Sequence, residues 1–282
     1  MVKRGFKTIE DVRKALKDNK LTLERNQCIG VQCYEDFLEQ MTRLEVEAIG
    51  KIIKDAILEE FPGEETKVEI TIMGSYRRGA SQCGDVDVLI THLDHVNEVP
   101  PQVLGEVVEK LLEAGRLAFH LTLISGMKVR RKDQFHEGGF NDCVDIPCKE
   151  KADKYSGSSY MGVFNSPIVE GKRRRVDIKF YPYRARAFCW LYFTGNGFFN
   201  RSMRLWATRK HGLLLNDKGL FTRESNKRVL EASEEKTVFD YLGVEWKEPH
   251  ERDCFDAVVG DDDPDKVSAD ERKEERNHQW IE

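Results

Sequence analysis

Helical spacing of apolar residues dominates the first part of the chain. Apolar positions three and four residues apart predict short helices within residues 1–40, at Ile9, Val12, Leu16, Tyr34, Phe37 and Leu38. Thr42-Arg43-Leu44-Glu45 then has the S/T-x-x-E pattern of a capping box, which predicts a helix that begins near residue 43. Its apolar positions recur at helical spacing, at Val46, Ile49, Ile53 and Ile57, and the helix is expected to end near Phe61-Pro62-Gly63.

Alternation of apolar and polar residues predicts three strands further along. They are centred on Val68, Ile70 and Ile72, on Val86, Val88 and Ile90, and on Val176, Ile178 and Phe180. A helix is predicted over residues 103–112, and residues 125–159 have no period, which indicates an insertion or a long loop. Beyond residue 182 the pattern is mostly helical to about residue 241. We therefore expect an α+β fold, with a mixed sheet flanked by helical modules at either end.

Length and composition exclude several classes of protein. The chain has 282 residues, 40% apolar and 34% charged, so it can bury a sizeable core and allows about two domains. No stretch approaches the ~20 apolar residues needed to cross a bilayer, and the charged N-terminus is followed by no apolar segment. Membrane and secreted proteins are therefore excluded as interpretations, and no feature of the sequence calls for an oligomer, so we expect a monomer.

The net charge of −5 is concentrated at the C-terminus. Residues 260–282 hold nine acidic and four basic residues, so the rest of the chain is neutral and can still carry a basic face. We expect the tail to be solvated and disordered, with self-masking of the basic face as the alternative. The seven cysteines form no disulfide rhythm and indicate reduced thiols. His136, Cys143 and Cys148 lack a paired C-x-x-C, so we expect no zinc site there.

Three aspartates are the strongest candidates for chemistry. Strand alternation places Asp85 and Asp87 on one face, and Asp177 lies in a later strand on the same face as Arg175 and Lys179. A carboxylate in a core-forming strand needs a partner, because burying it alone is costly. Two partners fit: an arginine in a structural salt bridge, or divalent metal ions shared with the other two aspartates in a two-metal site.

Residues suited to phosphate binding lie beside the aspartates. Gly74, Gly79 and Gly84 allow close approach of the backbone, Ser75 offers a hydroxyl and an amide, and Arg78 offers a bidentate guanidinium. Arg43 follows a predicted helix N-cap, where free amides and the helix dipole favour an anion. Three carboxylates beside such a loop form a coherent site for nucleotidyl transfer.

These motifs resemble the nucleotidyltransferase superfamily and, in detail, the X family of DNA polymerases. The resemblance covers residues 5 to about 255. It rests on residues 74–79, 84–92, 174–177, 191–195 and 199–204, together with Glu248-Pro249 and Glu251-Arg252-Asp253. It implies a partial helical DNA-binding subdomain at 1–42, a palm at 43–181, a thumb at 182–257 and a tail at 258–282. The family's lyase domain has no counterpart here, so we expect no abasic-sugar lyase activity.

The resemblance also implies roles for individual residues. Asp85, Asp87 and Asp177 would hold two Mg²⁺ ions, for which Mn²⁺ can substitute, and Asp177 would act on the primer 3′-hydroxyl. Arg43, Ser75, Arg78 and Gly84 would hold the β- and γ-phosphates of a deoxynucleoside triphosphate. The sugar and base would be held by Tyr192, Phe193, Gly195 and Asn200. Contacts with DNA would come from Arg175, Arg201 and Arg204, and the spacing of the last two on one helix face supports this assignment.

The function implied is template-directed DNA synthesis over short gaps or at broken ends in nuclear DNA repair, such as base excision repair or end joining. Its partners would be gapped or primer–template DNA, deoxynucleoside triphosphates and DNA-repair proteins. Terminal transfer without a template is the alternative within the enzyme class, although Tyr192-Phe193 resembles the template-dependent members. A non-catalytic module that binds DNA ends is the alternative outside it.

Overall fold

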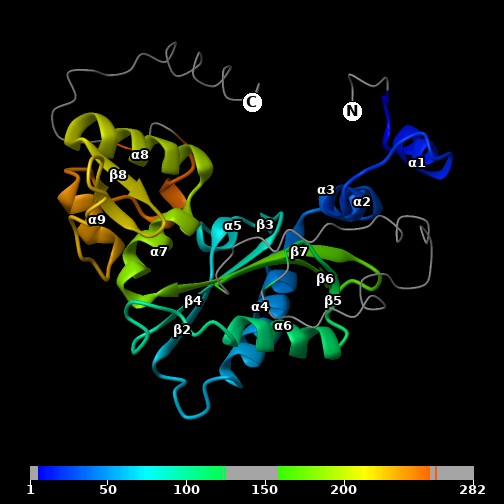
Figure 1. Cartoon of the computed structure of the whole chain (residues 1–282), viewed down its shortest axis with the longest axis horizontal. Coiled ribbons are helices and arrows are strands. Elements are labelled where there is room, and N and C mark those ends of the chain that lie inside the picture. The colour runs from blue at the N-terminus through cyan, green and yellow to red at the C-terminus, as the bar shows by residue number, and fades with distance from the viewer. Residues whose placement is uncertain (1–5, 123, 125–157, 255–257, 259–282) are drawn as a thin grey trace.

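The computed structural model describes residues 6–122, 124, 158–254 and 258 (Figure 1). Most of the expected insertion, the three zinc candidates and the acidic tail therefore lie outside the described residues. The α+β fold expected from the sequence is confirmed: a mixed sheet lies at the centre, with helices packed on it and gathered beyond both of its ends. None of the helices in the described part is long and apolar enough to span a bilayer.

The central sheet has five strands among the described residues, in the order β2-β4-β7-β6-β5. Their bounds are β2 Val68–Ile72, β4 Val86–His92, β5 Leu117–His120, β6 Ser159–Asn165 and β7 Arg173–Pro182. β4 and β7 run parallel, and the other neighbouring pairs are antiparallel. The three strands predicted from alternation are confirmed as β2, β4 and β7. The sequence pattern did not identify β5 and β6, which lie before and after the undescribed segment.

Two helices cover one face of this sheet. They are α4, Arg43–Leu58, and α6, Val103–Glu113, and both were predicted from helical spacing (Figure 1). Val46, Ile49 and Ile53 of α4 are fully buried and pack in one cluster with Val88 and Ile178 of the sheet. Because strand side chains alternate, the residues between those core positions point to the opposite face, which is where the candidate site lies.

The capping box predicted at the start of α4 forms only in part. Thr42 is the N-cap, and its hydroxyl accepts a hydrogen bond from the amide of Glu45 at 3.3 Å. The carboxylate of Glu45 is buried instead and accepts from Nε of Arg174 on β7 at 2.8 Å. A buried arginine without an anionic partner is strongly destabilising, so Glu45 pairs with Arg174 and does not complete the capping box.

Arg174 also attaches the N-terminal helices to the sheet. These helices are α1 Ile9–Lys17, α2 Arg25–Gln32 and α3 Tyr34–Leu38. A second nitrogen of the Arg174 guanidinium donates to the carbonyls of Asp36 and Glu39, at 3.1 and 3.2 Å. These two carbonyls lie at the C-terminal end of α3, where helical carbonyls have no partner within the helix. A side chain of β7 thus caps the C-terminal end of α3.

The chain beyond β7 forms a second layer of structure at the far end of the sheet. A short 3₁₀ turn, η4 Tyr183–Ala185, leads into α7 Arg186–Thr194 and α8 Gly197–His211, and α9 Glu235–Tyr241 and η5 Pro249–Glu251 follow later. The expectation of a mostly helical segment is incomplete, because β8 Leu213–Asn216 and β9 Gly219–Thr222 form a hairpin within it. The short apolar run before the turn does not separate a strand from a helix, although the turn residues Asn216 to Gly219 were a signal.

Candidate active site

The three predicted catalytic aspartates come together on the face of the sheet opposite α4 and α6. Asp87 on β4 and Asp177 on β7 are direct partners in the parallel register of these strands. Neighbouring strands lie about 4.8 Å apart, and partners in register point to the same face. Asp85 lies two residues before Asp87 and shares its face, and its carboxylate pairs with Arg175, two residues before Asp177. The pairing register of β4 and β7 therefore brings the three carboxylates together.

The carboxylates of this face repel one another. Burial, together with the charges of Asp85 and Asp177, raises the pKa of Asp87 to about 7, against the opposing charges of Lys179 and Arg175. Burial also raises the pKa of Asp177, and Lys179 opposes that rise. The nearby cations therefore do not neutralise the site. Lys179 itself donates to the hydroxyl of Ser159 at 2.7 Å, so its ammonium is already held by the neighbouring strand.

The donor set fits divalent cations. Carboxylate oxygens are the ligands that Mg²⁺ prefers, and three of them converge here from adjacent strands. Burial is the largest cause of the raised pKa at both Asp87 and Asp177, and at Asp87 the charges of the other two aspartates add to it, which indicates an excess of negative charge around Asp87. A bound divalent cation would remove that excess. The alternative of a purely structural salt bridge describes Asp85 with Arg175, but it does not describe the other two aspartates.

The predicted phosphate loop lies directly beside the aspartates. It begins in the short helix α5, Gly74–Arg77, and continues towards β3, Gln82–Cys83, which pairs with β1, Met41–Thr42. Gly74 has φ of +60°, and a Cβ at this position would overlap Oδ2 of Asp87, so only glycine fits. Gly84 meets no such limit, because a Cβ there would contact no described atom within 4 Å. The loop backbone thus touches the carboxylate cluster at Gly74.

The predicted phosphate-binding arginines hold backbone carbonyls in this structure. Arg43 stacks on the ring of Tyr76 at 3.8 Å and donates to the carbonyls of Tyr76 and Ala80, at 2.9 and 3.1 Å. Arg78 donates to the carbonyl of Thr194 at 2.7 Å, and burial lowers its pKa, against the charge of Asp87. Arg43 therefore braces the loop, and Arg78 connects the loop with the C-terminal end of α7.

The residues predicted to hold the sugar and base form one group at the junction of α7 and α8. Tyr192 and Phe193 pack edge to face, with ring centroids 5.1 Å apart, and Tyr192 keeps 37% of its surface exposed. Asn200 donates from its side-chain amide to the carbonyl of Tyr192 at 2.6 Å. Gly195, at the turn between the helices, has φ of +55° and ψ of −152°, a region essentially restricted to glycine. We call Tyr192 and Phe193 the aromatic platform.

The two predicted template contacts lie on α8 next to this platform. The guanidinium of Arg204 lies 6.0 Å from the ring centroid of Tyr192, and that of Arg201 lies 5.8 Å from the ring of Phe198. Both arginines are on the solvent side of a helix whose other face is buried through Phe199, Met203 and Ala207. Helical spacing predicted this separation of faces correctly.

A buried ion-pair network that the sequence analysis missed connects the phosphate loop with α9. Arg77 donates to both carboxylate oxygens of Glu235, at 3.1 and 2.6 Å, and to the hydroxyl of Thr194. Arg252 is fully buried and donates to the same carboxylate at 2.5 Å. Arg77 and Glu235 are 158 residues apart, and local sequence patterns carry no information on such a pair. The adjacent arginines Arg77 and Arg78 thus both bind Thr194.

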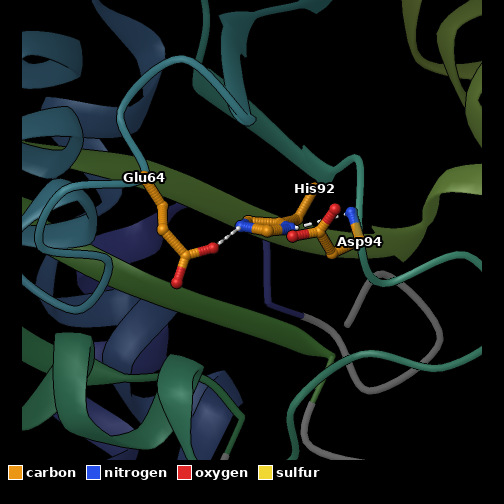
Figure 2. Close-up of side chains that lie close together, drawn as sticks. All are labelled: Glu64, His92 and Asp94. Atoms are coloured by element: carbon orange, nitrogen blue, oxygen red, sulfur yellow. Dashed lines mark hydrogen bonds and ion pairs between the residues drawn. The ribbon is translucent and has the colours of Figure 1, made fainter.

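A second group of metal-type side chains lies at the other end of β4. Ligand atoms of Glu64, His92 and Asp94 are within 4.8 Å of one another (Figure 2). His92 is five residues from Asp87, about 17 Å along a strand. Its Nδ1 accepts from the amide of Asp94 at 3.1 Å, so the neutral ring carries its proton on Nε2, which faces Glu64 at 3.1 Å. Lys67 already pairs with Asp94 at 2.7 Å. The amide of Asp94 and the ammonium of Lys67 thus already occupy two of the atoms that a metal ion would need as ligands, Nδ1 of His92 and Oδ2 of Asp94.

Fold and site together define a nucleotidyltransferase palm: adjacent strands bring three carboxylates beside a glycine-rich loop. Two family models match the chain, described as DNA polymerase beta palm over residues 40–183 and DNA polymerase beta thumb over residues 189–253. The chain belongs to the X family of DNA polymerases, as its motifs indicated.

The curated relatives agree with this family. Over 89% of its length, the chain is 32% identical to DNA polymerase lambda of Arabidopsis thaliana and 30% identical to DNA nucleotidylexotransferase of Eulemur macaco. Over the same share it is 29% identical to human DNA-directed DNA/RNA polymerase mu. The chain spans 43%, 47% and 48% of these three relatives, so it corresponds to less than half of each.

Proposed function

We propose that this chain is a DNA polymerase that transfers deoxynucleotides to a primer 3′-hydroxyl, under the direction of a template, over short gaps or at broken ends. The observation that carries the proposal is the register of β4 and β7, in which Asp87 lies directly opposite Asp177 on the face that also holds Asp85. Three carboxylates at one point on a sheet, beside a loop suited to phosphate, match the needs of nucleotidyl transfer, and a structural salt bridge accounts for Asp85 alone.

The chemistry proposed is an in-line displacement at phosphorus. The primer 3′-oxygen attacks the α-phosphorus of the triphosphate, a new P–O bond forms, and the bond to the β-phosphate oxygen breaks to release pyrophosphate. Two Mg²⁺ ions held by Asp85, Asp87 and Asp177 would supply charge neutralisation for the phosphates. Asp177 would orient the primer hydroxyl and accept its proton. The raised pKa of this carboxylate, which burial causes, suits a proton acceptor.

The remaining site residues would position the substrates. Arg43, Ser75, Arg78 and Gly84 would hold the β- and γ-phosphates, since they surround the loop beside Asp87. The aromatic platform, Gly195 and Asn200 would hold the sugar and base. Arg175, Arg201 and Arg204 would contact DNA, the last two on the template strand. This division assigns a palm to residues 43–181, a thumb to 182–257 and a partial DNA-binding subdomain to 1–42.

The partners proposed are gapped or primer–template DNA and deoxynucleoside triphosphates, with Mg²⁺ as the metal and Mn²⁺ as a substitute. The setting proposed is DNA repair in the nucleus, with the protein acting as a monomer. Untemplated addition is the second candidate, because a DNA nucleotidylexotransferase is among the relatives at 30% identity. Tyr192-Phe193 favours templated synthesis, because this pair resembles the template-dependent members of the family.

Extension of a labelled primer across a one-nucleotide gap tests the proposal, with each nucleotide supplied singly. We expect incorporation of the nucleotide that matches the template, and loss of incorporation in Asp177→Ala with the fold intact. Asp55→Ala is the matched control, because Asp55 is an exposed aspartate that pairs only with Lys51 on α4 among the described residues. Incorporation regardless of the template would favour terminal transfer. Binding of DNA without incorporation would favour a non-catalytic module.

A further inference from the structure

The end of the catalytic strand carries a contact that the proposed chemistry does not use. Tyr181 lies four residues after Asp177 on β7, and strand alternation places the two on the same face of the sheet. The hydroxyl of Tyr181 donates to Oδ2 of Asp217, which belongs to the turn between β8 and β9. A residue of the palm strand is thereby joined to the tip of the thumb hairpin.

Asp217 is presented by a rigid turn. The side-chain oxygen of Asn216 accepts from the amides of Lys218 and Gly219, at 2.8 and 3.1 Å, which fixes the four-residue turn. Arg228 donates to the carbonyl of Lys218 at 2.6 Å from outside the hairpin. Leu215 and Leu220, on either side of the turn, are buried in the thumb core. The carboxylate of Asp217 therefore moves only with the thumb as a whole.

Tyr181 also contacts the aromatic platform. Its ring lies 5.8 Å from that of Phe193, which packs edge to face with Tyr192. Both rings surround a small buried cluster formed by Met73, Leu89 and Cys189, which joins the phosphate loop, β4 and α7. Burial and the neighbouring Asp217 raise the pKa of Tyr181, so the phenol stays protonated and acts as the donor. One side chain thus meets the strand of Asp177, the thumb hairpin and the platform.

We propose that the hydrogen bond between Tyr181 and Asp217 is a positioning latch between palm and thumb, which fixes the aromatic platform relative to Asp177. The inference rests on the proposed function for its kinetic consequence. The latch acts through Phe193 and touches no substrate, so both of its members are positioning residues. Without it, the thumb hairpin would no longer hold the end of β7, and the platform would sample positions that bind the nucleotide less well.

Tyr181→Phe, Asp217→Ala and the double variant test the latch, with Tyr241→Phe as the control. Tyr181→Phe removes the hydroxyl and keeps the ring on Phe193, whereas Tyr241 is an exposed tyrosine on α9. Loss of a hydrogen bond to a charged group predicts a rise of about tenfold in KM for the incoming nucleotide in each single variant. The double variant should show the same rise, because both changes break one contact. We expect kcat and the Kd for gapped DNA to change less than twofold.

Amide hydrogen exchange gives a readout that does not depend on activity. Exchange across residues 213–222 should quicken about tenfold in both single variants, with no further gain in the double variant. If wild type incorporates no nucleotide but the exchange result holds, the proposed function fails and the latch stands. If exchange quickens but KM stays unchanged in active protein, the contact is structural and the proposal is overturned. The proposal is also overturned if amide exchange is unchanged in the single variants. It is overturned as well if the double variant shows the sum of the two single effects.

Discussion

Substitution of Asp87 by asparagine should stabilise the metal-free protein while it abolishes nucleotide transfer. The pKa of Asp87 is about 7 in the folded protein and 3.8 in the unfolded chain, and burial is the largest cause of this difference. That difference of about 3 pH units corresponds to about 4 kcal/mol at 1.36 kcal/mol for each unit. Solvent and side-chain relaxation reduce such energies, so we expect D87N to gain about 1–3 kcal/mol at pH 8. Asparagine keeps the shape and loses the charge.

The pH dependence of this gain has a defined sign. Between about pH 4 and pH 7 the folded protein binds a proton at Asp87 that the unfolded chain has released. The free energy of unfolding of wild type therefore falls as the pH rises through this window, relative to D87N. The advantage of D87N should be absent near pH 4 and complete at pH 8. Comparison of the two proteins cancels the titration of groups they share.

Urea denaturation in the presence of a chelator, at pH 5.5 and pH 8, measures this difference. Asp55→Asn is the control, because it removes an exposed carboxylate that pairs with Lys51 at 2.6 Å and should change stability by less than about 1 kcal/mol. Addition of Mg²⁺ should then stabilise wild type more than D87N, since a ligand stabilises the state that binds it. A D87N protein that is less stable than wild type at pH 8 without metal would refute the reasoning.

Three further substitutions test contacts in the site and at the other end of β4. Glu235→Gln leaves the buried Arg252 and the half-buried Arg77 without their anion, so urea denaturation should show a loss of about 3–5 kcal/mol; a loss below about 1 kcal/mol would contradict the network. Gly195→Ala places a side chain at φ of +55°, which should cost about 1–3 kcal/mol and raise KM for the nucleotide; unchanged values would count against a strained turn. Burial lowers the pKa of His92, so wild type should lose more stability than His92→Gln between pH 7.5 and pH 5.5, and equal losses would disprove this.

Local patterns predicted the elements of the site and the face on which its residues lie. Alternation placed Asp85 and Asp87 on one face and Asp177 on the face of its own strand, and the structure agrees. The pairing of β4 with β7 follows from tertiary packing, because 90 residues separate Asp87 from Asp177. The sequence pattern therefore left a shared metal site as one of two alternatives for Asp177, and the family resemblance favoured it.

Local sequence patterns could not predict where side chains point or which partners they contact. The position of Arg43 at a helix N-terminus was predicted correctly, but its contacts with Tyr76 and Ala80 depend on how the loop folds back on α4. Glu45 fits a capping box by spacing, and a buried arginine from β7 removes it from that role. In both cases a partner distant in the sequence outweighs the local preference, and a long-range partner has no local signature.

The three arginines proposed to bind substrate next to the aspartates and the phosphate loop already form hydrogen bonds within the protein before any substrate arrives. Arg175 pairs with Asp85, Arg78 donates to the carbonyl of Thr194, and Arg43 donates to two carbonyls of the phosphate loop. Binding of phosphate by these groups would therefore exchange one set of hydrogen bonds for another, so the net gain is smaller than the new contacts suggest. The exchange at Arg78 would also free the end of α7, which carries the aromatic platform. Phosphate binding, as proposed, would consequently be coupled to the position of the platform through Thr194, where Arg77 and Arg78 of the loop meet the end of α7.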